Sequence, residues 1–101
     1  MQTYNKLVRD RIPEIIKSKG GEFKTRILSD DEYKVELDKK LSEEIKEYQA
    51  DQNMDELADL LEIIYAIAEN NGVSKEELEK IRVDKAAKRG GFKDKIFLIE
   101  S

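Results

Sequence analysis

The chain has no cysteine and no histidine among its 101 residues, and these two absences remove several kinds of chemistry. Without cysteine, neither a disulfide framework nor a thiolate metal site can form. Without histidine, the chain lacks the usual zinc ligand and the commonest general base. The 23 Asp and Glu residues leave carboxylates as the main catalytic or metal-binding groups that the chain can offer.

Long apolar runs and an excess of positive charge are also missing. No stretch approaches the roughly 18 to 20 apolar residues that a transmembrane helix needs. The first residues lack the apolar run of a signal peptide, so we expect a cytoplasmic protein without a membrane partner. The formal net charge of −4 does not suggest binding to a nucleic acid polymer, because phosphate backbones are bound mainly by Lys and Arg. A local basic pocket for one phosphorylated small molecule remains compatible with this charge.

The length and the even composition predict one domain over residues 1–101. There is no internal repeat, no low-complexity stretch and no linker. The hydrophobic fraction is 39% and the charged fraction 42%, which predicts a narrow core and a heavily charged surface. Most of the charge lies on segments with apolar residues at helical spacing, which argues against wholesale disorder.

Helix start and stop signals predict four helices. Asp10 can act as the N-cap of the first helix, which carries Pro13 in its first turn. Ser29, Asn53 and Ser74 are each followed by Glu three residues later, a pattern typical of helix starts. The predicted helices cover roughly residues 11–19, 30–50, 54–71 and 75–89.

Two short segments have the character of strands. Residues 22–28 alternate loosely between apolar and polar side chains, and residues 95–99 form a short apolar run. These are the only strand candidates, so we predict that they pair into a small two-stranded β element. The fold class is therefore mainly α, with an antiparallel hairpin of the two long helices and this small β element.

The third predicted helix is apolar on nearly every side. From residue 57 to residue 68, only Asp59 and Glu62 are not apolar. Such a helix is buried on nearly every side, and one chain of this length has too few helices to cover it. We therefore expect a homodimer or a homotetramer.

Two acidic pairs at i, i+3 spacing stand on either side of the predicted hairpin turn. Glu44 and Glu47 precede the turn, and Glu56 and Asp59 follow it. Residues three apart lie on one face of a helix, and the short connection makes the two helices antiparallel neighbours. Glu47 and Glu56 should then lie level across the hairpin, with Glu44 and Asp59 about 4.5 Å further along the axis. Four carboxylates are expected to converge on one patch.

Oxygen ligands without His or Cys suit Mg²⁺, or Mn²⁺ as a substitute, better than zinc. The alternative is that these are ordinary acidic pairs on solvated helix faces, which arise often in so acidic a chain. Solvated surface is the better interpretation for six other glutamates, namely Glu36, Glu43, Glu62, Glu69, Glu76 and Glu79.

The segments 40–47 (KLSEEIKE) and 56–61 (ELADLL) resemble the MazG-like all-α nucleotide pyrophosphohydrolases, whose signature is ExxE on one helix and ExxD on the next. The opening segment 4–16 (YNKLVRDRIPEII) and the segment 85–92 (KAAKRGGF) are similar to a narrower, phosphoribosyl-ATP pyrophosphohydrolase-like branch of that superfamily. The resemblance covers essentially the whole chain.

The resemblance implies that Glu44, Glu47, Glu56 and Asp59 are the Mg²⁺ ligands and the catalytic residues. It also implies cleavage between the α- and β-phosphates of a canonical or non-canonical nucleoside triphosphate, or of a phosphoribosyl nucleotide. Related proteins are dimers or tetramers built on a four-helix bundle, which agrees with the apolar third helix. One departure is that only eight residues separate Glu47 from Glu56, fewer than in the better-known MazG enzymes, so the base pocket can differ.

A phosphate site needs cations beside the metal, and basic residues near both ends of the chain are the candidates. The candidate substrate-binding residues are Lys6, Arg9, Lys40, Lys85 and Arg89. Ordinary surface charge is the alternative for each of them.

Two functions from other classes remain open beside the enzyme. One is a catalytically weak nucleotide-binding or sensing module that keeps the fold and the metal. The other is a helical dimerisation protein whose acidic residues only solvate its surface. The sequence does not select the nucleobase, because this selectivity depends on the shape of the pocket.

Overall fold

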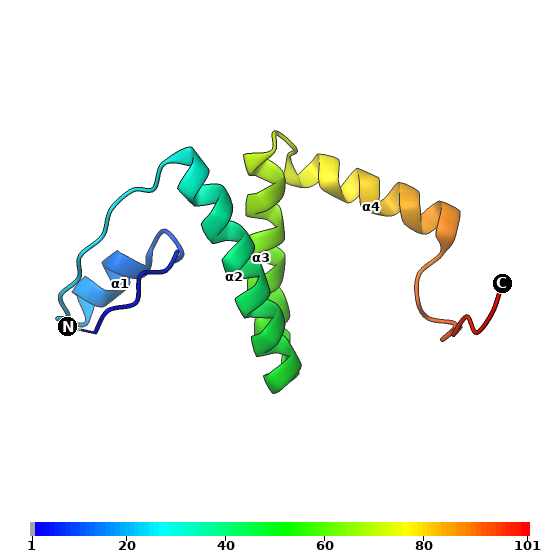
Figure 1. Cartoon of the computed structure of the whole chain (residues 1–101), viewed down its shortest axis with the longest axis horizontal. Coiled ribbons are helices and arrows are strands. Elements are labelled where there is room, and N and C mark those ends of the chain that lie inside the picture. Colours follow the sequence, from blue (N-terminus) through cyan, green and yellow to red (C-terminus); the bar gives the residue numbers. More distant parts are fainter. Residues whose placement is uncertain (1) are drawn as a thin grey trace.

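The structure, a computed structural model, describes residues 2–101, and this part of the chain contains four α-helices (Figure 1). The helices are α1 (Ile12–Ser18), α2 (Asp30–Asp51), α3 (Met54–Asn70) and α4 (Lys75–Arg89). The prediction of a mainly α fold is confirmed, and the predicted helix ends lie within one residue of the observed ones. None of the described helices is long and apolar enough to cross a bilayer.

Side-chain caps start three of the four helices. At α2, the Ser29 hydroxyl accepts from the Glu32 N–H (3.2 Å) and the Glu32 carboxylate accepts from the Ser29 N–H (3.1 Å), which completes a capping box. Asn53 and Ser74 accept from the third residue of α3 and of α4 in the same way. The prediction that Asp10 caps α1 was wrong. Arg11 takes that position without a side-chain cap, because the chain is already in a helical conformation there.

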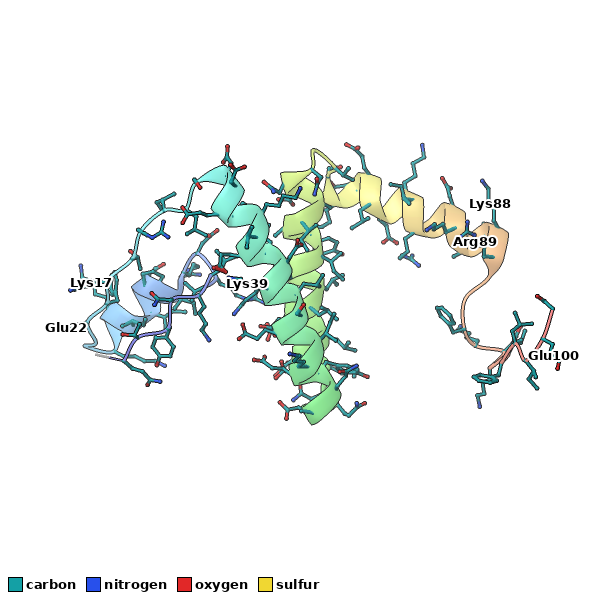
Figure 2. All side chains as sticks on the ribbon, viewed as in Figure 1. Lys17, Glu22, Lys39, Lys88, Arg89 and Glu100 are labelled. Atoms are coloured by element: carbon teal, nitrogen blue, oxygen red, sulfur yellow. The ribbon has the colours of Figure 1, made fainter. Side chains whose placement is uncertain are left out.

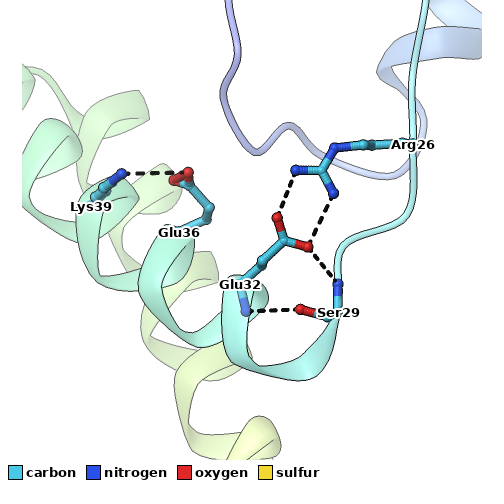
Figure 3. A network of polar contacts seen from close by, with 5 residues as sticks. All are labelled: Arg26, Ser29, Glu32, Glu36 and Lys39. Carbon is cyan, nitrogen blue, oxygen red and sulfur yellow. Dashed lines mark hydrogen bonds and ion pairs between the residues drawn. The ribbon is translucent and has the colours of Figure 1, made fainter.

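The capping box of α2 is extended by Arg26, as Figure 3 shows. The Arg26 guanidinium donates to both carboxylate oxygens of Glu32, at 3.0 and 2.7 Å. This bidentate pair, together with the Ser29 N–H, lowers the pKa of Glu32 to about 2. This contact attaches the segment between α1 and α2 to the first turn of α2.

We expect the Arg26→Ala variant to raise the pKa of Glu32 from about 2 towards its ordinary value, because the guanidinium is the largest cause of the shift. A carboxyl whose pKa is lowered by folding stabilises the fold above its unfolded pKa of about 4.3, and this contribution is lost as the pH falls through about 2. The free energy of unfolding of the variant should therefore decrease less than that of the wild type as the pH falls. NMR titration of the Glu32 carboxyl carbon measures the pKa directly. An unchanged titration curve would show that the pair does not form in solution.

The helices α2 and α3 form an antiparallel hairpin, side by side along most of their length (Figure 1). Gln52 makes the tight turn between them in the left-handed region, with φ of 57°. The core of this hairpin is narrow. In the described part of the chain, Leu37 is the only buried apolar residue, with 2% of its surface exposed.

The prediction of a two-stranded β element was wrong for the described residues, 2–101, which contain no strand. Residues 22–28 lead from α1 to α2, whereas residues 95–99 follow α4 at the opposite end of the molecule (Figure 1). The long axis of the chain measures 56 Å, and α4 points away from the hairpin. The two segments therefore do not meet, and a strand without a partner has no ladder of hydrogen bonds to stabilise it.

Apolar side chains of α3 remain uncovered in the single chain. Met54, Leu57, Leu61 and Ile64 are all exposed. The sequence predicts that α3 is buried on nearly every side. In the single chain, α2 and α4 leave part of its apolar surface exposed.

Candidate metal centre

A cluster of carboxylates lies where α2 and α3 face each other. Glu44 of α2 and Glu56 and Asp59 of α3 each offer an oxygen within 4.8 Å of the others. Glu44 also belongs to a second such group, with Glu43 and Glu47. All four carboxylates of the two acidic pairs therefore lie in one patch, at the place that the spacing around the short turn predicts.

Local sequence explains why these four side chains converge. Asn53 accepts a hydrogen bond from the Glu56 N–H at 3.0 Å, which fixes Glu56 in the first turn of α3. Asp59 lies three residues later, on the same face of the helix. The connection is two residues long, so the faces of α2 and α3 near the turn oppose each other.

The cluster is partly removed from water. Glu44 is only 6% exposed, and burial raises its pKa, with the neighbouring Glu47 adding to the effect. Partial desolvation and the same Glu47 carboxyl raise the pKa of Glu56 to about 6. The acidic groups therefore disfavour each other's ionisation, as expected for like charges without a cation between them.

Two carboxylate oxygens in this patch have no donor in the described part of the chain. Glu44 Oε2 and Glu56 Oε2 are shielded from solvent and accept no hydrogen bond. A buried acceptor without a partner is costly, so an arrangement of this kind fits a cation that the two oxygens can bind. An all-oxygen ligand set suits Mg²⁺ or Mn²⁺.

Three of the five candidate substrate-binding cations lie at the rim of this patch. Arg9 donates to Asp59 Oδ1 at 2.6 Å, although the two residues are 50 positions apart in the sequence. Lys40 Nζ lies 3.7 Å from Glu44 and 3.9 Å from Glu43, and Lys6 Nζ lies 3.8 Å from Glu43. The acidic patch thus has a basic border on the side of the N-terminal segment.

A cavity of about 280 Å³ opens at the first turn of α2, away from the carboxylates, and a smaller one of about 130 Å³ lies beside the basic border. The smaller cavity is lined by Asn5, Lys6, Leu7, Glu36, Lys39, Lys40 and Glu43. Of these two cavities, the smaller one adjoins the carboxylates, because Lys6, Lys40 and Glu43 line it and also form part of their rim.

Glu43 is a residue that the sequence interpretation assigned to solvated surface. The structure places it at the rim, near Lys6 and Lys40, with a carboxylate oxygen within 4.8 Å of oxygens from Glu44 and Glu47. Lys40, three residues earlier on the same helix face, was the sequence signal that could have placed Glu43 at the rim. The contact of Glu43 with Lys6 has no such signal, because it depends on the path of the N-terminal segment.

The other two candidate cations lie elsewhere in the single chain. Lys85 and Arg89 belong to α4, which packs against α3 only near the turn between them. Figure 2 shows Arg89 at the outer end of α4, far from the hairpin. Within one chain, these two residues are not brought to the carboxylate patch.

Comparison with known proteins adds one partial similarity. A protein of Mycolicibacterium smegmatis described as uncharacterized is 57% identical over 44 residues, which are 44% of this chain and 45% of that protein. The chain thus matches less than half the length of this relative. No family model and no solved structure matches the chain.

Proposed function

We propose that the protein is a Mg²⁺-dependent nucleotide pyrophosphohydrolase of the MazG-like type. The reaction adds water across the bond between the α- and β-phosphates, giving a nucleoside monophosphate and pyrophosphate. The substrate is a canonical or modified nucleoside triphosphate, or a phosphoribosyl nucleotide. The observation that carries the proposal is the patch of four carboxylates next to three cations, with two buried oxygens to which no described residue donates a hydrogen bond.

The proposed roles follow from the chemistry of the side chains. Glu44, Glu47, Glu56 and Asp59 would hold Mg²⁺, which supplies positive charge to phosphate oxygens and lowers the pKa of a water. One carboxylate of the patch would accept a proton from the attacking water. Arg9 would bind phosphate oxygens through its planar fork of donors. Lys6 and Lys40 would add positive charge at the rim.

A homodimer or homotetramer in the cytoplasm is part of the same proposal. The uncovered apolar side chains of α3 support the oligomer, because a second copy of the hairpin could bury them in a four-helix bundle. Sedimentation of the purified chain gives the number of copies.

The experiment that tests the activity is pyrophosphate release from a panel of nucleoside triphosphates and phosphoribosyl-ATP, with and without Mg²⁺. The proposal expects turnover of at least one nucleotide that requires the metal. Nucleotide binding without turnover would favour a sensing module. A folded protein that binds neither Mg²⁺ nor nucleotide would leave a helical dimerisation protein.

For Arg9→Ala, we expect kcat/KM to fall about 10- to 100-fold, because a charge-assisted hydrogen bond contributes about 1.5–3 kcal/mol. The affinity for Mg²⁺ in the absence of nucleotide should rise slightly, since Arg9 no longer competes for Asp59. Steady-state kinetics and calorimetric Mg²⁺ titration measure the two effects.

Arg11→Ala is the matched control for this variant. Arg11 carries the same charge two residues away, but it pairs with Glu14 on α1 and not with the carboxylate patch. Equal losses of activity in the two variants would contradict a specific role for Arg9.

A further inference from the structure

Residues 96–99 form an apolar segment that the other described residues of the single chain leave largely uncovered. Ile96, Phe97, Leu98 and Ile99 are between 75% and 88% exposed. Within the described chain, the backbone N–H and C=O groups of residues 96–101 have no backbone hydrogen-bond partner. A short apolar stretch with free backbone groups has the properties of a strand that lacks its neighbour.

Residues 22–28 have the complementary properties at the other end of the molecule. Ile27 is 95% exposed and Phe23 is also exposed. In the part of the chain that the structure describes, no backbone group of residues 22–28 makes a backbone hydrogen bond. The segment is nevertheless anchored, because Arg26 binds Glu32 at the start of α2. It therefore presents an open edge that is held in place at one end.

The two segments are kept apart within one chain by the junction of α3 and α4. Backbone hydrogen bonds from Asn71 and Val73 to the last turn of α3 fix this turn. The Lys75 ammonium lies 4.8 Å from the centre of the Tyr65 ring, which also ties the start of α4 to α3. As a result, α4 carries the tail away from residues 22–28 along the 56 Å axis (Figure 1).

We propose that residues 96–99 pair as a β-strand with residues 22–28 of a second copy of this chain. Such strand addition satisfies the free backbone groups of both segments and removes their apolar side chains from water. Reciprocal exchange between two copies gives a closed, symmetric dimer. A second copy is the occupant that the chain favours, because its residues 22–28 offer an edge long enough for the tail and without a backbone partner among the described residues.

The pairing has a consequence for the basic residues of α4. Residues 22–28 and the N-terminal segment that carries Arg9 lie on the same side of α2 (Figure 1). If the tail of one copy crosses to this side of the second copy, Arg89 at the end of α4 moves towards the second copy's basic border. Pairing of the strands itself requires neither Mg²⁺ nor turnover, so it can fail or succeed independently of the proposed activity.

The absence of native cysteine makes disulfide trapping a clean test. Thr25→Cys is mixed with Ile96→Cys, Phe97→Cys or Leu98→Cys in turn, because the register of the pair is not fixed in advance. Opposed residues of neighbouring strands lie close enough for a disulfide. After mild oxidation, we expect a covalent dimer in which mass spectrometry finds residue 25 linked to the tail. In these mixtures each cysteine sits on a different chain, so such a link is intermolecular by construction.

The control replaces Thr25→Cys with Ser18→Cys, an exposed position at the end of α1. This control should give little link to the tail. If the disulfide between residue 25 and the tail is no more abundant than the disulfide between residue 18 and the tail, the proposal is wrong. A chain that carries both Thr25→Cys and a tail cysteine distinguishes pairing between copies from pairing within one copy. A disulfide found only within single chains would show that the tail folds back on its own copy, and would also overturn the proposal.

Discussion

The Glu47→Gln variant is expected to lose Mg²⁺-dependent pyrophosphate release by about three orders of magnitude, because a bound metal supplies several kcal/mol of charge stabilisation. Glu47 offers an oxygen within 4.8 Å of one from Glu44, and its carboxyl raises the pKa of both Glu44 on α2 and Glu56 on α3. The amide keeps the shape of the side chain and removes its charge. Comparison of kcat/KM for wild type and variant at saturating Mg²⁺ measures the loss.

Glu69→Gln provides the matched control for this loss. It removes the same charge from an exposed position near the far end of α3, outside the carboxylate patch. Its kcat/KM should equal that of the wild type. If Glu47→Gln retained full activity while its circular dichroism spectrum showed a folded chain, the four-carboxylate site would be wrong.

The helices were predictable because their signals are local. A Ser or Asn cap and a Glu three residues later interact within one turn, so the starts of α2, α3 and α4 depend on a few neighbouring residues. The strands failed because pairing is not local. Residues 22–28 and 95–99 have suitable side chains, but the direction of α4 decides whether they meet, and no short motif encodes that direction.

The carboxylate patch was predictable for a related reason. Once the connection after α2 is two residues long, the positions of Glu47 and Glu56 relative to each other are nearly fixed. The rim is different, since the contact of Arg9 with Asp59 joins residues 50 positions apart. Sequence could name Arg9 as a candidate, but only the fold of the N-terminal segment brings it to Asp59. The same segment brings Lys6 to Glu43, which the sequence interpretation assigned to the surface.

The stability of the protein without metal gives a second large effect. We expect Glu44→Gln to raise the metal-free Tm by several degrees. Glu44 is nearly buried beside Glu47 and Asp59, and burial and these charges raise its pKa. A neutral amide removes this repulsion, although it also removes the ion pair with Lys40, which lies 3.7 Å away. We expect removal of the buried charge to outweigh the lost ion pair, because burial is the largest cause of the raised pKa and repulsion from Glu47 adds to it.

Addition of Mg²⁺ should reverse the order of the two proteins. A ligand at about 100 times its Kd stabilises the native state by about 2.7 kcal/mol. For a chain of this size, that corresponds to an increase in the Tm of roughly 10–20 °C, at about 4–8 °C per kcal/mol. The wild type should show this increase, and Glu44→Gln should show little of it. Differential scanning calorimetry with and without Mg²⁺ measures both.

Asp38→Asn separates this effect from a general loss of negative charge. Asp38 is exposed on the same helix, one and two-thirds turns before Glu44, and lies outside the carboxylate patch. It should keep the full Mg²⁺ response and gain little stability without metal. A wild type that ignores Mg²⁺, together with a stabilised Glu44→Gln, is the result expected of a helical dimerisation protein. A wild type stabilised by Mg²⁺ and a variant that is not would instead require a metal at Glu44, because the loss of repulsion alone cannot depend on the ion.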